Sequence, residues 1–214
     1  MPALIFDYDG LMVDTERVLA ECIVEAVTEW GGSVTFADFG HLFGSVDADH
    51  EWARLLPTWC GRDDLTMEHL AARITPDVRS RVEALPLLPG VTELLEAARA
   101  AGWAVGLGTG QRRERLEVRL ARFGIEGHFD AIVTRAEVPH GKPAPDIFLA
   151  VADRLGVAPP DCVVLEDSVP GSHAAVAAGM RVVVCPSPVS VHCEFPPEAR
   201  RVASLTELSL EDLV

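Results

Sequence analysis

Two carboxylates stand two residues apart in the segment Asp7-Tyr8-Asp9-Gly10, directly after the apolar run 3–6. Such a run is typical of a short buried strand, and Gly10 lets the backbone turn sharply where that strand ends. Ionised carboxylates this close repel one another, so a divalent metal ion, a lysine or a shared proton has to compensate their charge. Taken alone, the segment is equally consistent with an acidic loop that only caps a strand.

A single lysine, Lys142, stands among 17 arginines, in the loop sequence Gly-Lys-Pro-Ala-Pro. An ammonium is a compact charge that the planar guanidinium of arginine does not replace, so one retained lysine indicates a specific need for it. Chance survival in an arginine-rich chain is the alternative, and the position of Lys142 in the fold decides between them.

Short apolar segments rich in β-branched residues indicate five strands, at 3–6, 103–107, 131–134, 162–165 and 181–185. Helical periods at 91–101, 112–122, 146–155 and 171–178 alternate with them. This alternation predicts an α/β fold with a Rossmann-like parallel sheet covered by helices on both faces. Ligands of such sheets bind beyond the carboxyl ends of the strands, where the following side chains would meet: Asp7, Asp9, Thr109, Gly110, Lys142, Glu166 and Asp167.

The segment 16–85 interrupts the alternation with helical periods at 16–30, 36–43, 47–56 and 66–84 and almost no strand signal. We therefore expect two units. One is an α/β core formed by residues 1–15 and 86–214, and the other is an inserted helical cap formed by residues 16–85. The two connections between them are candidate hinges.

Composition excludes several classes of protein. The 214 residues are 49% hydrophobic and carry a formal charge of −15, which argues against a disordered chain and against general nucleic-acid binding. Five cysteines without a Cys-x-x-Cys pair indicate neither a disulfide framework nor a zinc site. No apolar stretch is long enough to cross a bilayer. We expect a cytoplasmic protein that binds neither membrane nor nucleic acid, as a monomer or weak homodimer.

The segments at the predicted rim resemble the motifs of the haloacid dehalogenase (HAD) superfamily, in its phosphatase and β-phosphoglucomutase-like branch with a helical cap. The resemblance covers residues 3 to about 185. The four similar stretches are Asp7-Tyr8-Asp9-Gly10 with Asp14-Thr15-Glu16, Leu107-Gly108-Thr109-Gly110, the run 141–146, and Leu165-Glu166-Asp167-Ser168.

The resemblance implies that Asp7 attacks phosphorus and forms an aspartyl-phosphate, as a carboxylate already ionised at neutral pH. It implies Mg²⁺ as the cofactor, bound by the Asp7 carboxylate, the Asp9 backbone carbonyl and Asp167. Glu166 would contact the metal directly or through another ligand. A dipole-stabilised acidic helix cap is the other interpretation of Glu166 and Asp167.

The resemblance also implies a phosphate site formed by Asp7, Asp9, Gly10, Thr109, Gly110 and Lys142. Thr109 and the Gly110 amide would hold phosphoryl oxygens, and Thr109 could also cap the next helix, a role compatible with phosphate contact. Lys142 would offset negative charge on the nucleophile and on the transferring group. Asp146, after a proline, either starts a helix or orients Lys142.

Asp9 has a separate expected role as general acid and base. It would protonate the leaving alkoxide and then deprotonate the water that attacks the aspartyl-phosphate, and crowding beside Asp7 would help it hold a proton. Displacement of a halide needs no such acid. The presence of Asp9 therefore favours phosphoryl transfer over carbon–halogen cleavage.

Other functions are less consistent with the chain. By the family pattern a sugar phosphomutase carries a cap histidine where Leu19 stands, and an arginine where Gly44-Ser45-Val46-Asp47 places Asp47. A receiver-like signalling module phosphorylates an aspartate on a middle strand and has no helical insert, and a non-catalytic binding protein would not need every reactive residue type. We therefore expect hydrolysis of a small phosphorylated metabolite, namely a sugar, polyol or glycolate phosphate, with phosphomutase as the alternative.

Overall fold

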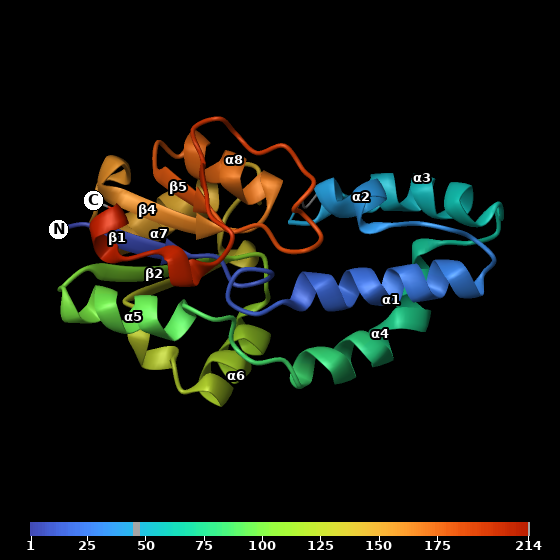
Figure 1. Cartoon of the computed structure of the whole chain (residues 1–214), viewed down its shortest axis with the longest axis horizontal. Coiled ribbons are helices and arrows are strands. Elements are labelled where there is room, and N and C mark those ends of the chain that lie inside the picture. Colours follow the sequence, from blue (N-terminus) through green and yellow to red (C-terminus); the bar gives the residue numbers. More distant parts are fainter. Residues whose placement is uncertain (45–47, 214) are drawn as a thin grey trace.

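The computed structural model of the chain describes residues 1–44 and 48–213. Figure 1 shows the strands and their covering helices gathered around both chain ends, while the helices between residues 15 and 83 extend to one side of this body. Among the described helices, none combines the length and the apolarity that crossing a membrane requires.

The strands form one parallel sheet in the order β3-β2-β1-β4-β5-β6. Crossing connections join successive strands because parallel neighbours cannot be linked by tight turns. The strands are β1 (Ala3–Phe6), β2 (Ala104–Thr109), β3 (Ala131–Thr134), β4 (Cys162–Glu166), β5 (Arg181–Val184) and β6 (Arg200–Arg201). The predicted α/β fold is confirmed, and β1, which carries the first motif, lies near the middle of the sheet.

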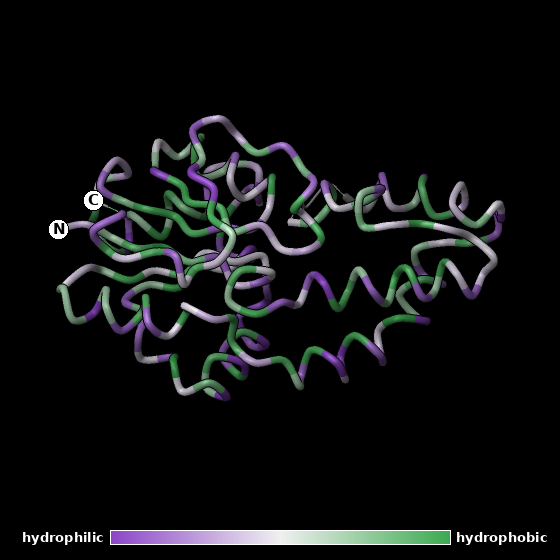
Figure 2. The backbone as a smooth tube through the Cα atoms, in the orientation of Figure 1, coloured by the Kyte–Doolittle hydropathy of each residue, from purple (hydrophilic) through white to green (hydrophobic). Residues whose placement is uncertain are grey.

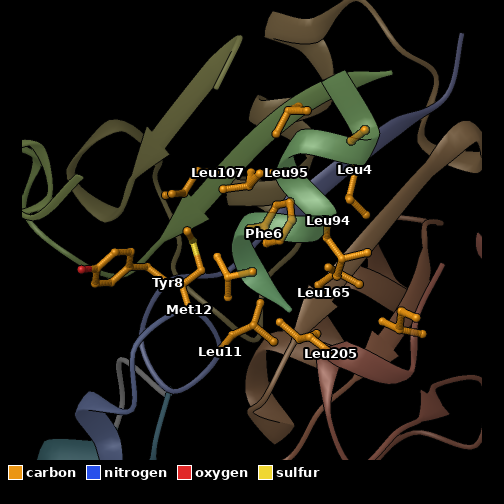
Figure 3. Close-up of a cluster of buried hydrophobic side chains, with 14 of the residues drawn as sticks. Leu4, Phe6, Tyr8, Leu11, Met12, Leu94, Leu95, Leu107, Leu165 and Leu205 are labelled. Atoms are coloured by element: carbon orange, nitrogen blue, oxygen red, sulfur yellow. The ribbon is translucent and has the colours of Figure 1, made fainter. Parts of the chain in front are cut away.

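Alternate residues of β1 point to opposite faces of the sheet and enter two separate apolar clusters. Leu4 and Phe6 pack against α5 (Val91–Ala100) and α6 (Arg113–Phe123), as the close-up in Figure 3 shows for Leu94 and Leu95 of α5. Ala3 and Ile5 pack against α7 (Asp146–Leu155) and α8 (Val169–Ala177). In Figure 2 the central strands are mostly green, because apolar residues face both sides of the sheet, and this explains why they read as apolar runs.

The four helices beside the sheet are α1 (Thr15–Glu29), α2 (Phe36–Phe39), α3 (Ala48–Cys60) and α4 (Met67–Glu83). They enclose a third apolar cluster, in which Phe39 and Trp52 lie with ring centroids 5.3 Å apart. Short 3₁₀ turns complete the described chain, at Gly40–Leu42, Glu126–His128, Arg135–Glu137, Pro159–Asp161, Leu205–Glu207 and Leu210–Leu213. We keep the names core (1–15 and 86–214) and cap (16–85) for the two units, and their division remains a proposal.

Differences from the predicted elements are small, with one exception. The expected helix 47–56 begins at Ala48 and continues to Cys60, with Pro57 in its last turn, while Asp47 lies outside the described residues. The exception is the stretch after Cys185, for which the sequence pattern predicts no helix, strand or site. It supplies β6 and a buried loop around Val189, which packs into the cap cluster.

Candidate active site

Pairing between the central strands sets the position of Asp7. β1 lies between β2 and β4, with Phe6 opposite both Leu107 and Leu165. Asp7 extends this register by donating its backbone amide to Leu165 O at 3.0 Å. The carboxyl ends of the three strands therefore meet at one rim, and the Asp7 side chain lies beside the end of β4.

Lys142 comes from the loop before α7, and its Nζ contacts Asp7 Oδ1 and, at 2.6 Å, Glu166 Oε1. The lysine side chain is only 6% exposed. Burial alone would favour the neutral amine, but the charges of Asp7 and Glu166 outweigh it and raise the pKa of Lys142. The only lysine of the chain is therefore a buried cation between two carboxylates, a position that argues against chance survival.

Glu166 is fixed by donors on both of its oxygens. Oε1 accepts from Lys142, and Oε2 accepts from the amides of Asp167 at 2.9 Å and Ser168 at 2.8 Å and from the Ser168 hydroxyl at 2.9 Å. A side chain at Gly171, in the first turn of α8, would overlap the Glu166 carboxylate. The glycine therefore permits the close approach that aims Glu166 at Lys142.

Asp167 differs from Glu166 because its two buried carboxylate oxygens have no hydrogen-bond partner among the described residues. Carboxylate oxygens of Asp7, Glu166 and Asp167 lie within 4.8 Å of one another. Burial first, and then the charges of Glu16 and Glu166, raise the pKa of Asp167. Unpartnered hard oxygen donors in a buried acidic cluster fit a divalent cation such as Mg²⁺.

The charge balance at Asp7 depends on the groups buried beside it. Burial raises the pKa of Asp7, and although Lys142 lowers it, Glu166 raises it again, so that the net shift is upward. The sequence predicts that Asp7 is ionised at neutral pH, and this stays a prediction, because the ionised form depends on nearby positive charge. Three buried carboxylates share one ammonium, and two further positive charges would balance them.

Gly10 permits the close approach of the first and fourth motifs. Its backbone has a φ of 80°, a left-handed conformation that favours glycine, and a side chain there would overlap the Asp167 carboxylate. The turn that the sequence predicts at Gly10 therefore also makes room for Asp167.

Asp9 points into the same site but has different partners. Its Oδ1 accepts from the Thr15 hydroxyl at 2.7 Å, and Gln111 Nε2 lies 2.8 Å from both Asp9 oxygens. Arg119 Nη1 is 3.7 Å from Oδ1, and the Asp9 side chain is 23% exposed. Sequence reasoning missed the roles of Gln111 and Arg119. Gln111 follows the second motif and could have been suspected, whereas nothing in the sequence near Arg119 indicates a contact with Asp9.

Thr109 ends β2 and is fully buried, and its hydroxyl accepts from the Gln111 amide at 3.1 Å. Gly110 and Gln111, but not Thr109, line the cavity beside Asp7. The structure thus gives Thr109 a role in shaping the loop, while its predicted contact with phosphate stays a prediction. Asp146 starts α7 as one interpretation expected, and its Oδ1 contacts His140 Nδ1 at 3.0 Å and not Lys142.

A loop that sequence reasoning left without a function supports the fourth motif from behind. The buried Ser190 donates its hydroxyl to Asp167 O at 2.6 Å. In the same loop Val189 packs on the cap, where a side chain at Gly40 would overlap the Val189 carbonyl. The backbone that presents Asp167 is therefore tied to a segment in contact with the cap.

One cavity of about 540 Å³ joins the rim to the cap. On the core side it is lined by Asp7, Asp9, Lys142 and several other polar residues, and on the cap side by α1, α4 and residues near α3. A volume of this size suits a small organic ligand. The cavity therefore gives such a ligand simultaneous access to the carboxylates and to the helical wall.

Comparison with known proteins links this geometry to one family. The profile of the haloacid dehalogenase-like hydrolases matches residues 1–179. Hexitol phosphatase B of Escherichia coli (strain K12) is 34% identical over 99% of this chain and 96% of its own length. Fructose-1-phosphate phosphatase YqaB of the same strain is 36% identical over 84% of this chain and 94% of its own length.

A solved structure resembles the whole chain as well. CbbY from Rhodobacter sphaeroides, crystallised with phosphate, superposes with a TM-score of 0.74 at 26% identity, covering 98% of this chain and 97% of its own. The likeness includes the sheet and the helices beside it.

Proposed function

Because the chain belongs to the haloacid dehalogenase-like hydrolases, we propose that it is a Mg²⁺-dependent phosphomonoester hydrolase that works through an aspartyl-phosphate on Asp7. The observation that supports this most is the buried group of Asp7, Lys142 and Asp167, of which Asp7 and Lys142 line the cavity. A carboxylate held by an ammonium, beside a second carboxylate with unpartnered oxygens, is suited to accept a phosphoryl group near a cation.

In this proposal Asp7 attacks phosphorus with one carboxylate oxygen, and the ester oxygen leaves from the opposite side. Lys142 stays protonated and offsets charge on the phosphoryl oxygens, while Glu166 keeps the lysine in place. The Gly110 amide and the loop shaped by Thr109 would hold the remaining phosphoryl oxygens. No base is needed to activate the nucleophile once its carboxyl is ionised.

The metal would be held by the Asp7 and Asp167 carboxylates and the Asp9 backbone carbonyl. When bound, Mg²⁺ would supply the positive charge that keeps both carboxyls ionised and would neutralise charge on the phosphate. Glu166 suits a supporting role better than direct ligation, because Lys142, two backbone amides and a hydroxyl already occupy its oxygens.

Asp9 would give a proton to the leaving oxygen and later take one from the water that hydrolyses the aspartyl-phosphate. Thr15 and Gln111 fix the direction of its carboxyl, and Arg119 adds a nearby positive charge. The cap would cover the cavity during these steps and limit the entry of water.

The substrate would be a small phosphorylated metabolite. The sequence predicts a sugar, polyol or glycolate phosphate, and two relatives are phosphatases named for a hexitol and for fructose 1-phosphate. Leu19, which replaces the histidine expected of a phosphomutase, lines the cavity wall. That position supports hydrolysis over phosphate transfer within a sugar.

Phosphate release from p-nitrophenyl phosphate tests the proposal. We expect turnover with Mg²⁺, none after chelation with EDTA, and none for Asp7→Asn, whereas Glu93→Gln, at an exposed position on α5, serves as the matched control. Asp9→Asn should accumulate a covalent phosphoenzyme that intact-protein mass spectrometry detects. Full turnover in EDTA, or by Asp7→Asn, would contradict the proposed mechanism.

A further inference from the structure

The cap side of the active-site cavity is a long apolar wall. Thr15, Leu19 and Ile23 follow one another at intervals of four residues on α1 and all line the cavity. At a rise of 1.5 Å per residue, this face extends about 12 Å from Thr15, the residue that holds Asp9. The wall therefore starts at the proposed acid and leads away from it into the cap.

Helix α4 forms the opposite side of the same space. Leu70, Ile74, Val78 and Val82 share one face of this helix and line the cavity, and α4 packs along α1. In Figure 1 the two helices run next to each other outward from the sheet. The part of the cavity between them is an extension that is continuous with the catalytic rim, and we refer to it as the α1–α4 channel.

Beyond Glu16, Trp52 is the one side chain with a hydrogen-bonding group that lines the channel from the described part of the cap. The other side chains that residues 17–44 and 50–85 contribute to the lining are hydrocarbon or, at Met67, a thioether. Glu16 itself lies at the carboxylate end, where burial raises its pKa. The polar lining residues Gln111, Arg115, Arg119 and Arg135 come from the core.

Polar and apolar alcohols would bind very differently in such a channel. A sugar or polyol would bring several hydroxyl groups against a wall that is mostly hydrocarbon, and each hydroxyl left unpaired weakens binding by about tenfold. A hydrocarbon group would instead release water from both surfaces. Each buried methylene strengthens binding by about three- to fourfold.

We propose that the alcohol part of the substrate is apolar, so that the enzyme hydrolyses alkyl or aryl phosphate monoesters whose hydrocarbon group occupies the α1–α4 channel. This inference rests on the proposed phosphatase function and replaces the sugar or polyol that the relatives suggest with a different class of alcohol. Asp7 and Lys142 would bind the phosphate in either case. The channel decides which alcohol accompanies it.

A series of n-alkyl phosphates from methyl to hexyl, assayed with the full-length enzyme and Mg²⁺, tests the inference. We expect kcat/KM to rise about three- to fourfold per methylene, and hexyl phosphate to exceed a hexitol phosphate of the same carbon number by at least about 100-fold. The matching n-alkyl phosphonates, which are not hydrolysed, should show the same trend in Kd by calorimetry. A flat series, or a hexitol phosphate that matches or exceeds hexyl phosphate, would overturn the apolar substrate class.

The two proposals fail in different ways. Turnover of p-nitrophenyl phosphate together with a flat alkyl series contradicts the substrate class only, whereas no turnover of any ester with Mg²⁺ contradicts the phosphatase function and this inference with it. Variants at Leu19, a half-buried position, locate the effect. Leu19→Asn should lower the ratio of kcat/KM for hexyl over ethyl phosphate about tenfold, while Leu19→Met should keep it.

Val78→Asn provides the same test from α4 if Leu19→Asn does not fold, because Val78 is half-buried on the other side of the channel. Val118→Asn, at a surface position with 72% exposure, is the matched control and should leave the ratio unchanged. An unchanged ratio in a folded Leu19→Asn or Val78→Asn variant would show that the hydrocarbon group lies elsewhere.

Discussion

The rim of the sheet and the wall of the cap face the same cavity, but they are built from opposite kinds of side chain. At the rim, Asp7, Lys142 and Asp167 are buried ionisable groups, whereas Leu19 and Ile74 of the cap present hydrocarbon. Burying like charges costs free energy unless other charges compensate them, while burying hydrocarbon gains it. Removing a carboxylate from the rim should therefore lower activity without lowering stability, and substitutions in the cap should not change the chemical step directly.

Asp7→Asn should give the largest difference between its effect on activity and its effect on stability. Without the attacking oxygen we expect kcat to fall by about 10⁴-fold or more. The unfolding free energy in the absence of metal should not fall, because the change removes one of three crowded carboxylates. Steady-state kinetics and thermal unfolding followed by circular dichroism measure the two effects. A large loss of stability without loss of kcat would mean that Asp7 serves the stability of the fold and not the reaction.

Lys142→Met should damage both properties. Removing the ammonium leaves Asp7 and Glu166 without their shared cation, a loss of about 3–5 kcal/mol for a broken buried pair. Trp52→Ala, in the cap cluster, should cost a similar 3–5 kcal/mol through lost packing. Urea unfolding compares the stabilities of the two variants. When both variants are assayed at urea concentrations below their unfolding midpoints, only Lys142→Met should be unable to carry out the chemical step.

The contrast between rim and cap also explains how far the sequence could predict the site. The apolar runs 3–6 and 131–134 coincide with β1 and β3, because strands buried on both faces need apolar residues throughout. Parallel strands bring their carboxyl ends together, which is why Asp7, Lys142, Glu166 and Asp167 could be grouped in advance.

The remaining features depend on contacts between distant segments. Arg119 reaches Asp9 from the second half of α6, and Ser190 supports Asp167 from a loop that carries no motif. The two-residue strand β6 consists of Arg200 and Arg201, whose side chains give no strand signal. Its existence depends on pairing with β5, and such long-range pairing is invisible in a local pattern.

Gly171→Ala tests whether the rim depends on close packing as well as on charge. The added methyl group would overlap Glu166 and push it away from Lys142. Because outer partners orient the reactive groups, we expect kcat to fall about 10- to 100-fold. Gly127→Ala is the matched control, since a side chain there meets nothing within 4 Å. Equal kinetics for the two variants would mean that the position of Glu166 does not matter for the reaction.

Glu137 offers the smallest effect and the clearest contrast with Asp7, because it is a carboxylate near the same end of the sheet whose charge is fully paired. It accepts from the Thr134 amide at 2.8 Å and hydroxyl at 2.7 Å, and from Arg113 at 2.7 Å and Arg154 at 2.9 Å. Although burial opposes ionisation, these donors lower the pKa of Glu137 to about 2 from its ordinary 4.5.

The sign of the pH effect follows from this lowered pKa. The folded state binds the Glu137 proton more weakly than the unfolded state, so the network stabilises the protein fully above about pH 4.5 and loses its contribution as the pH falls towards 2. Because the side chain is 27% exposed, we expect Glu137→Gln to cost about 1–2 kcal/mol at pH 6 and almost nothing near pH 2. Urea titrations of both proteins across this range measure the difference, with the exposed Glu93→Gln as control. If the difference in unfolding free energy between the two proteins does not depend on pH, the effect of Glu137→Gln comes from packing. Glu137 would then not support the contrast between a paired and an unpaired carboxylate.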